Sequence, residues 1–224
     1  MQTISIIIPV LNEEKFLEQN KDILKSYIAE KNEIVLIDGG SRDNSVHIAK
    51  LIGCKTFVTK ASRGYQLHLG ALQSTNELLL FLHADTELPE NALAIISEAL
   101  IQNNKHWGCF EVCFSNSKFI YQIIAWFMNK RSCLTGIVTG DQAMFVKRES
   151  YFASGGFPNF SIMEDIQISR QLKKIAPPVC LSEKVITSGR KWESQGAFKT
   201  IIKMWSLRFL FFLGVSTNKL VKLY

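Results

Sequence analysis

The sequence lacks the features that mark several common protein classes. No apolar stretch reaches the roughly 18 to 20 residues that a membrane-spanning helix needs. The N-terminus has neither the positively charged region nor the long apolar region of a signal peptide. The five cysteines include no Cys-x-x-Cys pair and no Cys-His set that completes a zinc site. We therefore expect a cytoplasmic protein whose cysteines are reduced thiols.

Two further absences narrow the function. The pair Gly39-Gly40 lacks the G-x-G-x-x-G spacing of a dinucleotide-binding loop. The net charge of +6 comes entirely from residues 190–224, which hold seven Lys/Arg and one acid, so residues 1–189 are neutral overall. A positive charge confined to one end argues against a whole-surface nucleic-acid binder and indicates a local anionic partner.

Apolar runs and amphipathic segments alternate along the first half of the chain, and less regularly along the second. The expected strands are residues 5–10, 34–37, 55–59, 78–82, 107–114, 143–146 and 179–187. The expected helices are residues 16–28, 46–51, 63–72, 89–100, 119–128 and 164–174, with Asn12 as a cap and Pro89 in a first turn. This order predicts an α/β fold with a mainly parallel central sheet flanked by helices. We expect one domain over residues 1–195 and a helical extension over residues 196–224.

Acidic residues follow three of the predicted strands. Glu13 follows the first strand and Asp38 the second, while Asp85 follows a strand that is an uninterrupted apolar run. The carboxyl ends of parallel strands meet at one edge of the sheet, where open α/β sheets bind ligands. Asp85 and His83 together could hold a divalent metal, and the metal could hold a phosphate. Asp38 could contact a base or ribose, or serve only its own turn.

Four segments, taken in order, carry a resemblance to a known family. They are Ser5-Ile-Ile-Ile-Pro-Val-Leu-Asn-Glu13, Ile37-Asp-Gly-Gly-Ser-Arg-Asp-Asn-Ser45, Phe81-Leu-His-Ala-Asp85 and Met163-Glu-Asp165. They resemble the motifs of family 2 glycosyltransferases, above all the small single-domain bacterial members with a His-Ala-Asp variant of the D-x-D motif. The resemblance covers residues 4 to about 175. It implies a GT-A-like fold, a nucleotide-sugar donor, a divalent metal (Mn or Mg) and inversion at the anomeric carbon.

The resemblance also implies roles for the matching residues. Asp165 would be the general base for the acceptor hydroxyl, and Asp85 would hold the metal. Asp38 would contact the base of the donor, and Arg63 its phosphates or ribose. The residues expected on the donor side are Pro9, Leu11, Glu13, Asp38, Arg63, Ala84 and Asp85.

The chain departs from the family pattern at two positions. His83 stands where the first D-x-D aspartate usually lies, so it is a candidate second metal ligand, a donor to a phosphate, or a plain strand-end residue. Imidazole suits Mn²⁺ better than Mg²⁺. Gly39 replaces an acid that is common in the second motif, which leaves the base of the donor open. The Q-x-x-R-W signature of processive synthases is missing, so we expect a single transfer.

Candidate acceptor-side residues lie near the predicted base or after the last strand. They are Gly140, Asp141, Gln142, Glu164, Arg190 and Trp192. The glycine-led triplet could instead be a plain turn, and Glu164 a first-turn acid that the helix dipole favours. Arg190 and Trp192 could contact a phosphate or the acceptor.

The C-terminal segment from Phe198 to Leu213 combines aromatic residues with Lys199, Lys203 and Arg208. A basic, aromatic-rich amphipathic helix suits an anionic membrane surface, which would bring the protein to the inner face of the membrane and to a lipid-linked acceptor. The alternative is a packing helix that covers the core or forms a homodimer contact. No nucleic-acid partner is expected.

Two other functions remain open at this point. A nucleotidyltransferase that acts on a sugar phosphate would have a similar sheet, but its phosphate loop should be glycine-rich and basic, whereas Leu11 to Glu14 is acidic. A catalytically degenerate domain would bind a nucleotide sugar without turnover. His83 and Gly39 favour that alternative, and the presence of both Asp85 and Asp165 counts against it.

Overall fold

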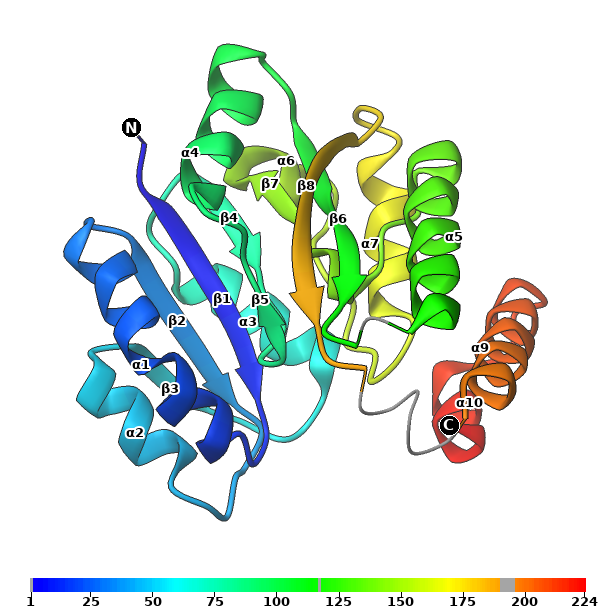
Figure 1. The fold of residues 1–224 in the computed structure, drawn as a ribbon, viewed down its shortest axis with the longest axis horizontal. Coiled ribbons are helices and arrows are strands. Elements are labelled where there is room, and N and C mark those ends of the chain that lie inside the picture. Colours follow the sequence, from blue (N-terminus) through cyan, green and yellow to red (C-terminus); the bar gives the residue numbers. More distant parts are fainter. Residues whose placement is uncertain (1, 117, 190–195) are drawn as a thin grey trace.

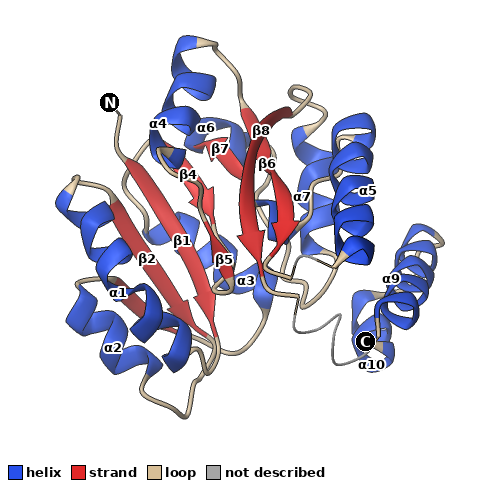
Figure 2. Ribbon diagram, in the orientation of Figure 1, coloured by secondary structure: helices blue, strands red, loops and turns tan. Residues whose placement is uncertain are grey.

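The computed structural model describes residues 2–116, 118–189 and 196–224, which form one eight-stranded sheet between helices (Figure 1; Figure 2 separates helices from strands). The strands are β1 (Ile4–Val10), β2 (Glu33–Asp38), β3 (Lys55–Val58), β4 (Leu78–Phe81), β5 (Thr86–Glu87), β6 (Trp107–Phe114), β7 (Phe145–Lys147) and β8 (Val179–Thr187). The helices are α1 (Glu14–Ala29), α2 (Ser45–Ile52), α3 (Arg63–Gln73), α4 (Ala92–Ser97), α5 (Phe119–Thr135), α6 (Arg148–Ala153), α7 (Glu164–Leu172), α9 (Ala197–Phe212) and α10 (Thr217–Leu223). A π-helical turn at Glu98–Gln102 extends α4, and a 3₁₀ turn lies at Gly140–Gln142.

The sheet order is β3-β2-β1-β4-β7-β6-β8-β5, and it confirms the α/β prediction. The four strands β3, β2, β1 and β4 are mutually parallel, whereas β7 runs antiparallel to both of its neighbours and β5 antiparallel to β8. The chain builds β2 and β3 on one side of β1 and then returns to place β4 on the other side. The carboxyl ends of β1 and β4 therefore flank a switch point, where open α/β sheets bind ligands.

Both faces of the parallel strands are buried, which is why these strands are apolar without alternation. Along β1, Ile6 and Ile8 face the helices α1, α2 and α4, while Ile7 faces α3, α6 and α7. Trp107 and Phe110 of β6 are fully buried as well. Each such side chain contributes about 1.5–3 kcal/mol through burial, so the sheet is a rigid base for the loops at its edge.

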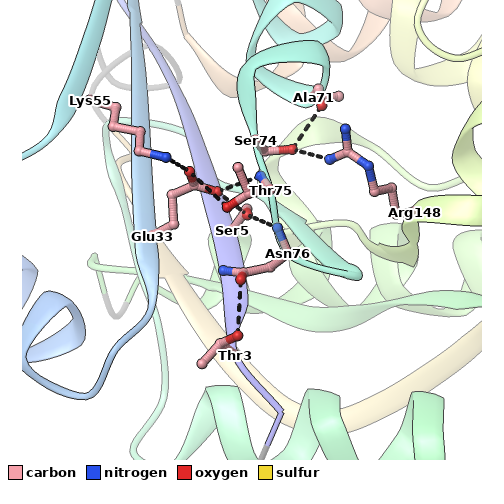
Figure 3. Close-up of polar contacts among 9 residues, drawn as sticks. All are labelled: Thr3, Ser5, Glu33, Lys55, Ala71, Ser74, Thr75, Asn76 and Arg148. Atoms are coloured by element: carbon pink, nitrogen blue, oxygen red, sulfur yellow. Dashed lines mark hydrogen bonds and ion pairs between the residues drawn. The ribbon is translucent and has the colours of Figure 1, made fainter.

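A polar cluster closes the amino edge of the parallel strands (Figure 3). The Glu33 carboxylate accepts hydrogen bonds from Lys55, from the Ser5 hydroxyl and, at 2.8 Å, from the backbone N–H of Thr75. Ser5 Oγ accepts in turn from the N–H of Asn76 at 3.2 Å. The cluster ties three strands and the loop before β4 together at the edge away from the predicted site.

The two helix-start predictions are wrong in detail. Asn12 does not cap α1: it adopts a positive φ of 57°, and its side-chain oxygen accepts from the N–H of Arg42 in the next loop. Asparagine tolerates this conformation because its short polar side chain bonds locally. Pro89 does not open α4, which begins at Ala92 after Asn91 in a left-handed conformation.

The structure also contains elements that the sequence did not predict. The strand β5 has only two residues and α6 only six, too few for a hydrophobic period to stand out. The prediction that all cysteines are free thiols is wrong for two of them, because Cys133 and Cys180 form a disulfide. Their positions lie on α5 and β8, 47 residues apart in sequence, so only the fold brings them together.

The C-terminal extension forms two helices that pack on the main domain (Figure 1). Leu207 of α9 and Leu220 of α10 form a buried cluster with Met163 and Ile166, which flank the start of α7. The extension therefore rests beside the Glu164-Asp165 pair. Within the described ranges, no helix combines the length and the apolar character needed to cross a membrane.

Candidate functional site

The loops after β1 and β2 are tied to each other by backbone and side-chain hydrogen bonds. The N–H of Asn12 donates to Ser41 Oγ and the N–H of Glu13 to Ser45 Oγ, each over 2.8 Å. Asp38 is 1% exposed, and its carboxylate accepts from the N–H groups of Gly40 and Ser41 at 2.8 and 2.9 Å. Asp38 thus shapes its own turn, and the loops predicted to bind the donor are organised before any ligand arrives.

Four other predicted donor-side residues lie at the same edge. Pro9 is near the end of β1 and half-buried, while Leu11 just beyond it is 46% exposed. After β4, Ala84 is buried and Asp85 is exposed. The exposed positions of Leu11 and Asp85 leave both side chains accessible to a ligand in solution.

Gln66 is a site residue that sequence analysis missed. Its side chain is buried, and Nε2 donates to the carbonyl oxygens of Val10 at 3.2 Å and Ile37 at 2.9 Å. Because Gln66 lies on α3, it anchors that helix to the ends of β1 and β2, three residues from Arg63. An amide on the otherwise apolar face of a helix was the available signal.

His83 joins the donor side to the acceptor side. Its Nε2 atom contacts the guanidinium of Arg63, and its Nδ1 atom lies 3.0 Å from Oδ1 of Asp141. A guanidinium can only donate, so we assign Nε2 as the acceptor and place the ring proton on Nδ1, which donates to Asp141. Both ring nitrogens of His83 are therefore engaged in this arrangement.

Two glycines permit close approaches at this site, Gly140 beside His83 and Gly64 beside the loop before α7. A Cβ atom on Gly140 would stand 2.1 Å from His83 Nε2, and one on Gly64 would stand 2.0 Å from the carbonyl oxygen of Pro158. Gly140 also donates its N–H to Oδ2 of Asp165 over 3.3 Å. Contacts therefore link His83, just after β4, through Gly140 to Asp165 at the start of α7.

Glu164 is a buried acid with a perturbed pKa. Burial and, to a smaller extent, the neighbouring charge of Asp165 raise its pKa to about 8, although the charge of Arg63 opposes the shift. The Arg63 Nε atom lies 3.5 Å from Glu164 Oε1, a distance that by itself indicates an ion pair. We take burial as the stronger effect, because this carboxyl is 5% exposed, and conclude that Glu164 is largely protonated at neutral pH.

A small cavity collects these groups. Its polar lining is formed by His83, Gly140, Glu164 and Asp165, and Leu67 and Phe157 are among its apolar walls. Asp85 does not line it and lies two residues beyond His83. A larger groove between α1 and residues 86–94 contains none of the predicted site residues. The small cavity therefore brings His83 together with Glu164 and Asp165, whereas a cavity shared by Asp85 and Asp165 stays a prediction.

The last residue of the turn at Gly140–Gln142 anchors the turn through buried hydrogen bonds. Gln142 is buried, and its Oε1 accepts from Ser132 Oγ at 2.6 Å and from the backbone and side chain of Thr139 at 3.2 Å. Gln142 therefore positions Gly140 and Asp141 instead of facing a ligand. Arg190 and Trp192 lie outside the described residues.

The described ranges contain no group of three His, Cys, Asp or Glu side chains that could bind a metal. Mg²⁺ that carries phosphates commonly uses one or two carboxylates and completes its shell with water and phosphate oxygens. The exposed carboxylate of Asp85 fits that pattern. His83 does not fit it in this arrangement, because Arg63 contacts its Nε2 atom.

Comparison with known proteins gives related matches in sequence and in fold. The model of the family described as "Glycosyl transferase family 2" matches residues 5–154. The "4,4'-diaponeurosporenoate glycosyltransferase" of Staphylococcus haemolyticus is 37% identical over 113 residues, which are 46% of this chain and 28% of that protein. The "Undecaprenyl-phosphate 4-deoxy-4-formamido-L-arabinose transferase" of Pseudomonas paraeruginosa is 32% identical over 111 residues, which are 44% of this chain and 32% of that protein.

A solved structure shares the fold. The mannosyltransferase PcManGT from Pyrobaculum calidifontis, in complex with GDP-Man and Mn²⁺, superposes with a TM-score of 0.60 at 20% identity, over 83% of this chain and 56% of that chain. The matched segments span less than a third of the length of either curated relative.

Proposed function

Because the chain belongs to glycosyl transferase family 2, we propose that it transfers one sugar from a nucleotide-sugar donor to an acceptor hydroxyl, with inversion. One observation supports this assignment most directly: the contacts that run from Arg63 and His83 through Gly140 to Asp165. They bring a cation, at the edge where α/β sheets bind ligands, next to a carboxylate that can act as a base.

The donor would lie across the switch point between β1 and β4. Its nucleoside would contact the loops of Pro9 to Glu13 and of Asp38, and its diphosphate would face Arg63 and Asp85. The complex of the Pyrobaculum enzyme with GDP-Man and Mn²⁺ supports a nucleotide sugar and a divalent metal as ligands here. Asp85 would hold the metal, and His83 could join it only after Arg63 turns from the imidazole to the phosphates.

In the proposed reaction, groups of this chain accept the acceptor proton and stabilise the leaving diphosphate. The acceptor O–H bond breaks and its proton passes to Asp165, while the acceptor oxygen bonds to the anomeric carbon. The bond between that carbon and the diphosphate oxygen breaks, and its electron pair leaves with the nucleoside diphosphate. Arg63 faces the developing charge. A divalent ion, when bound, would neutralise part of that charge. Attack from the face opposite the leaving group inverts the sugar.

We also propose a cytoplasmic protein that associates with the inner face of the membrane through α9, near a lipid-linked acceptor. Trp205 is 71% exposed and Phe209 is 64% exposed, and residues 196–224 contain five Lys/Arg and no acid. Aromatic rings beside unopposed basic charge suit an anionic lipid surface. The undecaprenyl-phosphate transferase among the relatives supports a lipid-linked acceptor.

The disulfide Cys133–Cys180 counts against a reducing compartment, and a thiol titration of protein from cytoplasm would check that point.

The activity is tested with a panel of UDP-, GDP- and dTDP-sugars, with and without Mn²⁺, by following release of the nucleoside diphosphate. We expect one donor class to turn over and Mn²⁺ to accelerate it. Asp85→Asn should lose that acceleration, whereas Asp22→Asn, an exposed change on α1, should keep it. Donor binding without turnover would indicate the degenerate alternative, and failure to bind any donor would refute the proposal.

A further inference from the structure

Two arginines without carboxylate partners lie half-buried near the predicted base. Arg131 belongs to α5 and Arg208 to α9. Among the residues that the structure describes, neither guanidinium has a carboxylate within ion-pair distance. The Nε atom of each is buried and makes no hydrogen bond. A buried N–H without an acceptor costs free energy, so both side chains have unused binding capacity.

The positive charges of Arg131 and Arg208 lie within electrostatic range of each other and of acids of the site. Burial and, to a smaller extent, the charge of Arg208 lower the pKa of Arg131 to about 10. Asp165 and Asp141 act in the opposite direction, which places both aspartates within electrostatic range of Arg131. Like charges held together in a half-buried place destabilise the protein unless an anion joins them.

The fold directs both arginines to this place. The Nη2 atom of Arg131 donates to Ser132 Oγ at 3.1 Å, and Ser132 donates to Gln142, which shapes the turn that carries Asp141. Arg208 follows Leu207, whose side chain packs with Met163 and Ile166 on either side of the Glu164-Asp165 pair. Residues 196–224 contain no Asp or Glu, so the extension brings no counterion with Arg208.

We propose that Arg131 and Arg208 bind a phosphate group of the acceptor and thereby hold the acceptor hydroxyl at Asp165. This inference rests on the proposed sugar transfer and deepens it, because it names the acceptor as a phosphate-bearing alcohol. Planar guanidinium groups with several N–H donors match phosphate oxygens in geometry and charge. The C-terminal extension then completes the acceptor site, and Arg63 is left for the donor.

The first test measures binding of inorganic phosphate and of UDP to the full chain by titration calorimetry. Arg131→Gln and Arg208→Gln should each weaken phosphate binding by about 10- to 100-fold, the range expected for a charge-assisted hydrogen bond. UDP affinity should stay within about twofold, because removing either charge leaves Arg63 in place. Arg170→Gln is the matched control: it removes an exposed guanidinium of α7 that stacks on Phe212 at 4.7 Å, and it should keep phosphate binding.

Thermal unfolding separates a binding role from a structural one. Without phosphate, each Gln variant should be at least as stable as the wild type, because it removes one of two repelling charges. With phosphate, the wild type should gain melting temperature and the variants should not. The proposal fails if phosphate stabilises the Arg131→Gln/Arg208→Gln double variant as much as the wild type, or if the variants lose UDP affinity to the same extent.

Two further probes identify the source of the phosphate. Glycerol 3-phosphate represents a soluble acceptor, and phosphatidylcholine vesicles with phosphatidic acid represent a lipid-borne one. Binding of either probe that depends on Arg131 and Arg208 supports the inference and selects the source, whereas binding of neither refutes it. If no form of the protein binds a nucleotide sugar but the two arginines still control phosphate binding, the proposed function fails and the phosphate site stands.

Discussion

The two edges of the parallel strands differ in how their charges are satisfied. At the amino edge, Glu33 is surrounded by donors, and its carboxylate bonds to a lysine, a hydroxyl and a backbone N–H (Figure 3). At the carboxyl edge, two adjacent acids share a cavity with a histidine, and two nearby arginines keep an Nε atom without a partner. The first arrangement stabilises the fold. The second leaves binding capacity unused, as expected where a charged ligand is to be held.

The same contrast appears in the pKa values of two glutamates, the half-buried Glu33 and the buried Glu164. Burial by itself would raise the pKa of Glu33, but hydrogen bonds from Lys55, Ser5 and Thr75 together hold it below its ordinary value. Burial and Asp165 raise the pKa of Glu164 to about 8, and Arg63 does not offset them. One edge stabilises the charged form of its glutamate, and the other stabilises the neutral form.

The largest expected effect is on catalysis at the carboxyl edge. Asp165→Asn should lower the rate of transfer by about 100- to 10,000-fold, because the acceptor hydroxyl would lose its general base. The free energy of unfolding should change by less than about 1.5 kcal/mol, because the side-chain oxygen of Asn can still accept from the N–H groups of Gly140 and Ile166. Rate measurements at saturating donor, paired with urea unfolding, check both statements. A variant that keeps its rate would exclude Asp165 as the base.

A change at the amino edge should lower the stability of the protein and leave its catalytic rate unchanged. Glu33→Ala should lower the free energy of unfolding by about 1–3 kcal/mol, because the donors on Ser5 and Thr75 lose their acceptor. Its specific activity per folded molecule should be unchanged. The control is Glu18→Ala, which removes an exposed pair with Lys21 at 3.8 Å, worth about 0–1 kcal/mol. The contribution of Glu33 should be present above pH 4.5, its ordinary pKa, and be lost as the pH falls through its lowered folded pKa.

The contribution of Glu164 to the free energy of unfolding should depend on pH with the sign opposite to that of Glu33. Its folded pKa of about 8 lies above the ordinary 4.5, so the folded state holds a proton that the unfolded state has released. Stability from this group is therefore fully present below pH 4.5 and declines towards pH 8, by at most about 1.4 kcal/mol per pH unit. Glu164→Gln should flatten this decline in unfolding curves at several pH values. An unchanged slope in that variant would show that Glu164 is not the titrating group.

The smallest expected effect concerns the surface of α9. Replacing Trp205 and Phe209 by Ser should weaken sedimentation with anionic vesicles several-fold and leave binding to neutral vesicles low. The control is Leu51→Ser, which changes a 67% exposed apolar side chain on α2. An equal loss of vesicle binding in the Leu51→Ser protein and in the Trp205/Phe209 double variant would indicate non-specific adhesion. Concentration-dependent dimers that disappear in the double variant would indicate the homodimer alternative instead.

Sequence analysis succeeded where the physics is local. The strands 107–114 and 179–187 have the predicted bounds, because hydrophobic runs closed by polar or turn residues identify buried strands directly. The same argument predicts the placement of Glu13, Asp38 and Asp85, since parallel strands bring their carboxyl ends to one edge. It failed at Pro89 and at β5, where a left-handed residue and a two-residue strand produce no periodic signal.

The sequence by itself determined the alternation of strands and helices and the edge at which the acids gather, because both depend on hydrophobic pattern and chain direction. Only the tertiary structure decided that Arg63 contacts His83, that Glu164 is buried beside Asp165, and that Arg131 and Arg208 lie within electrostatic range of each other. These contacts join helices and strands that are distant in the chain. Their energies depend on burial and separation, which no local pattern encodes.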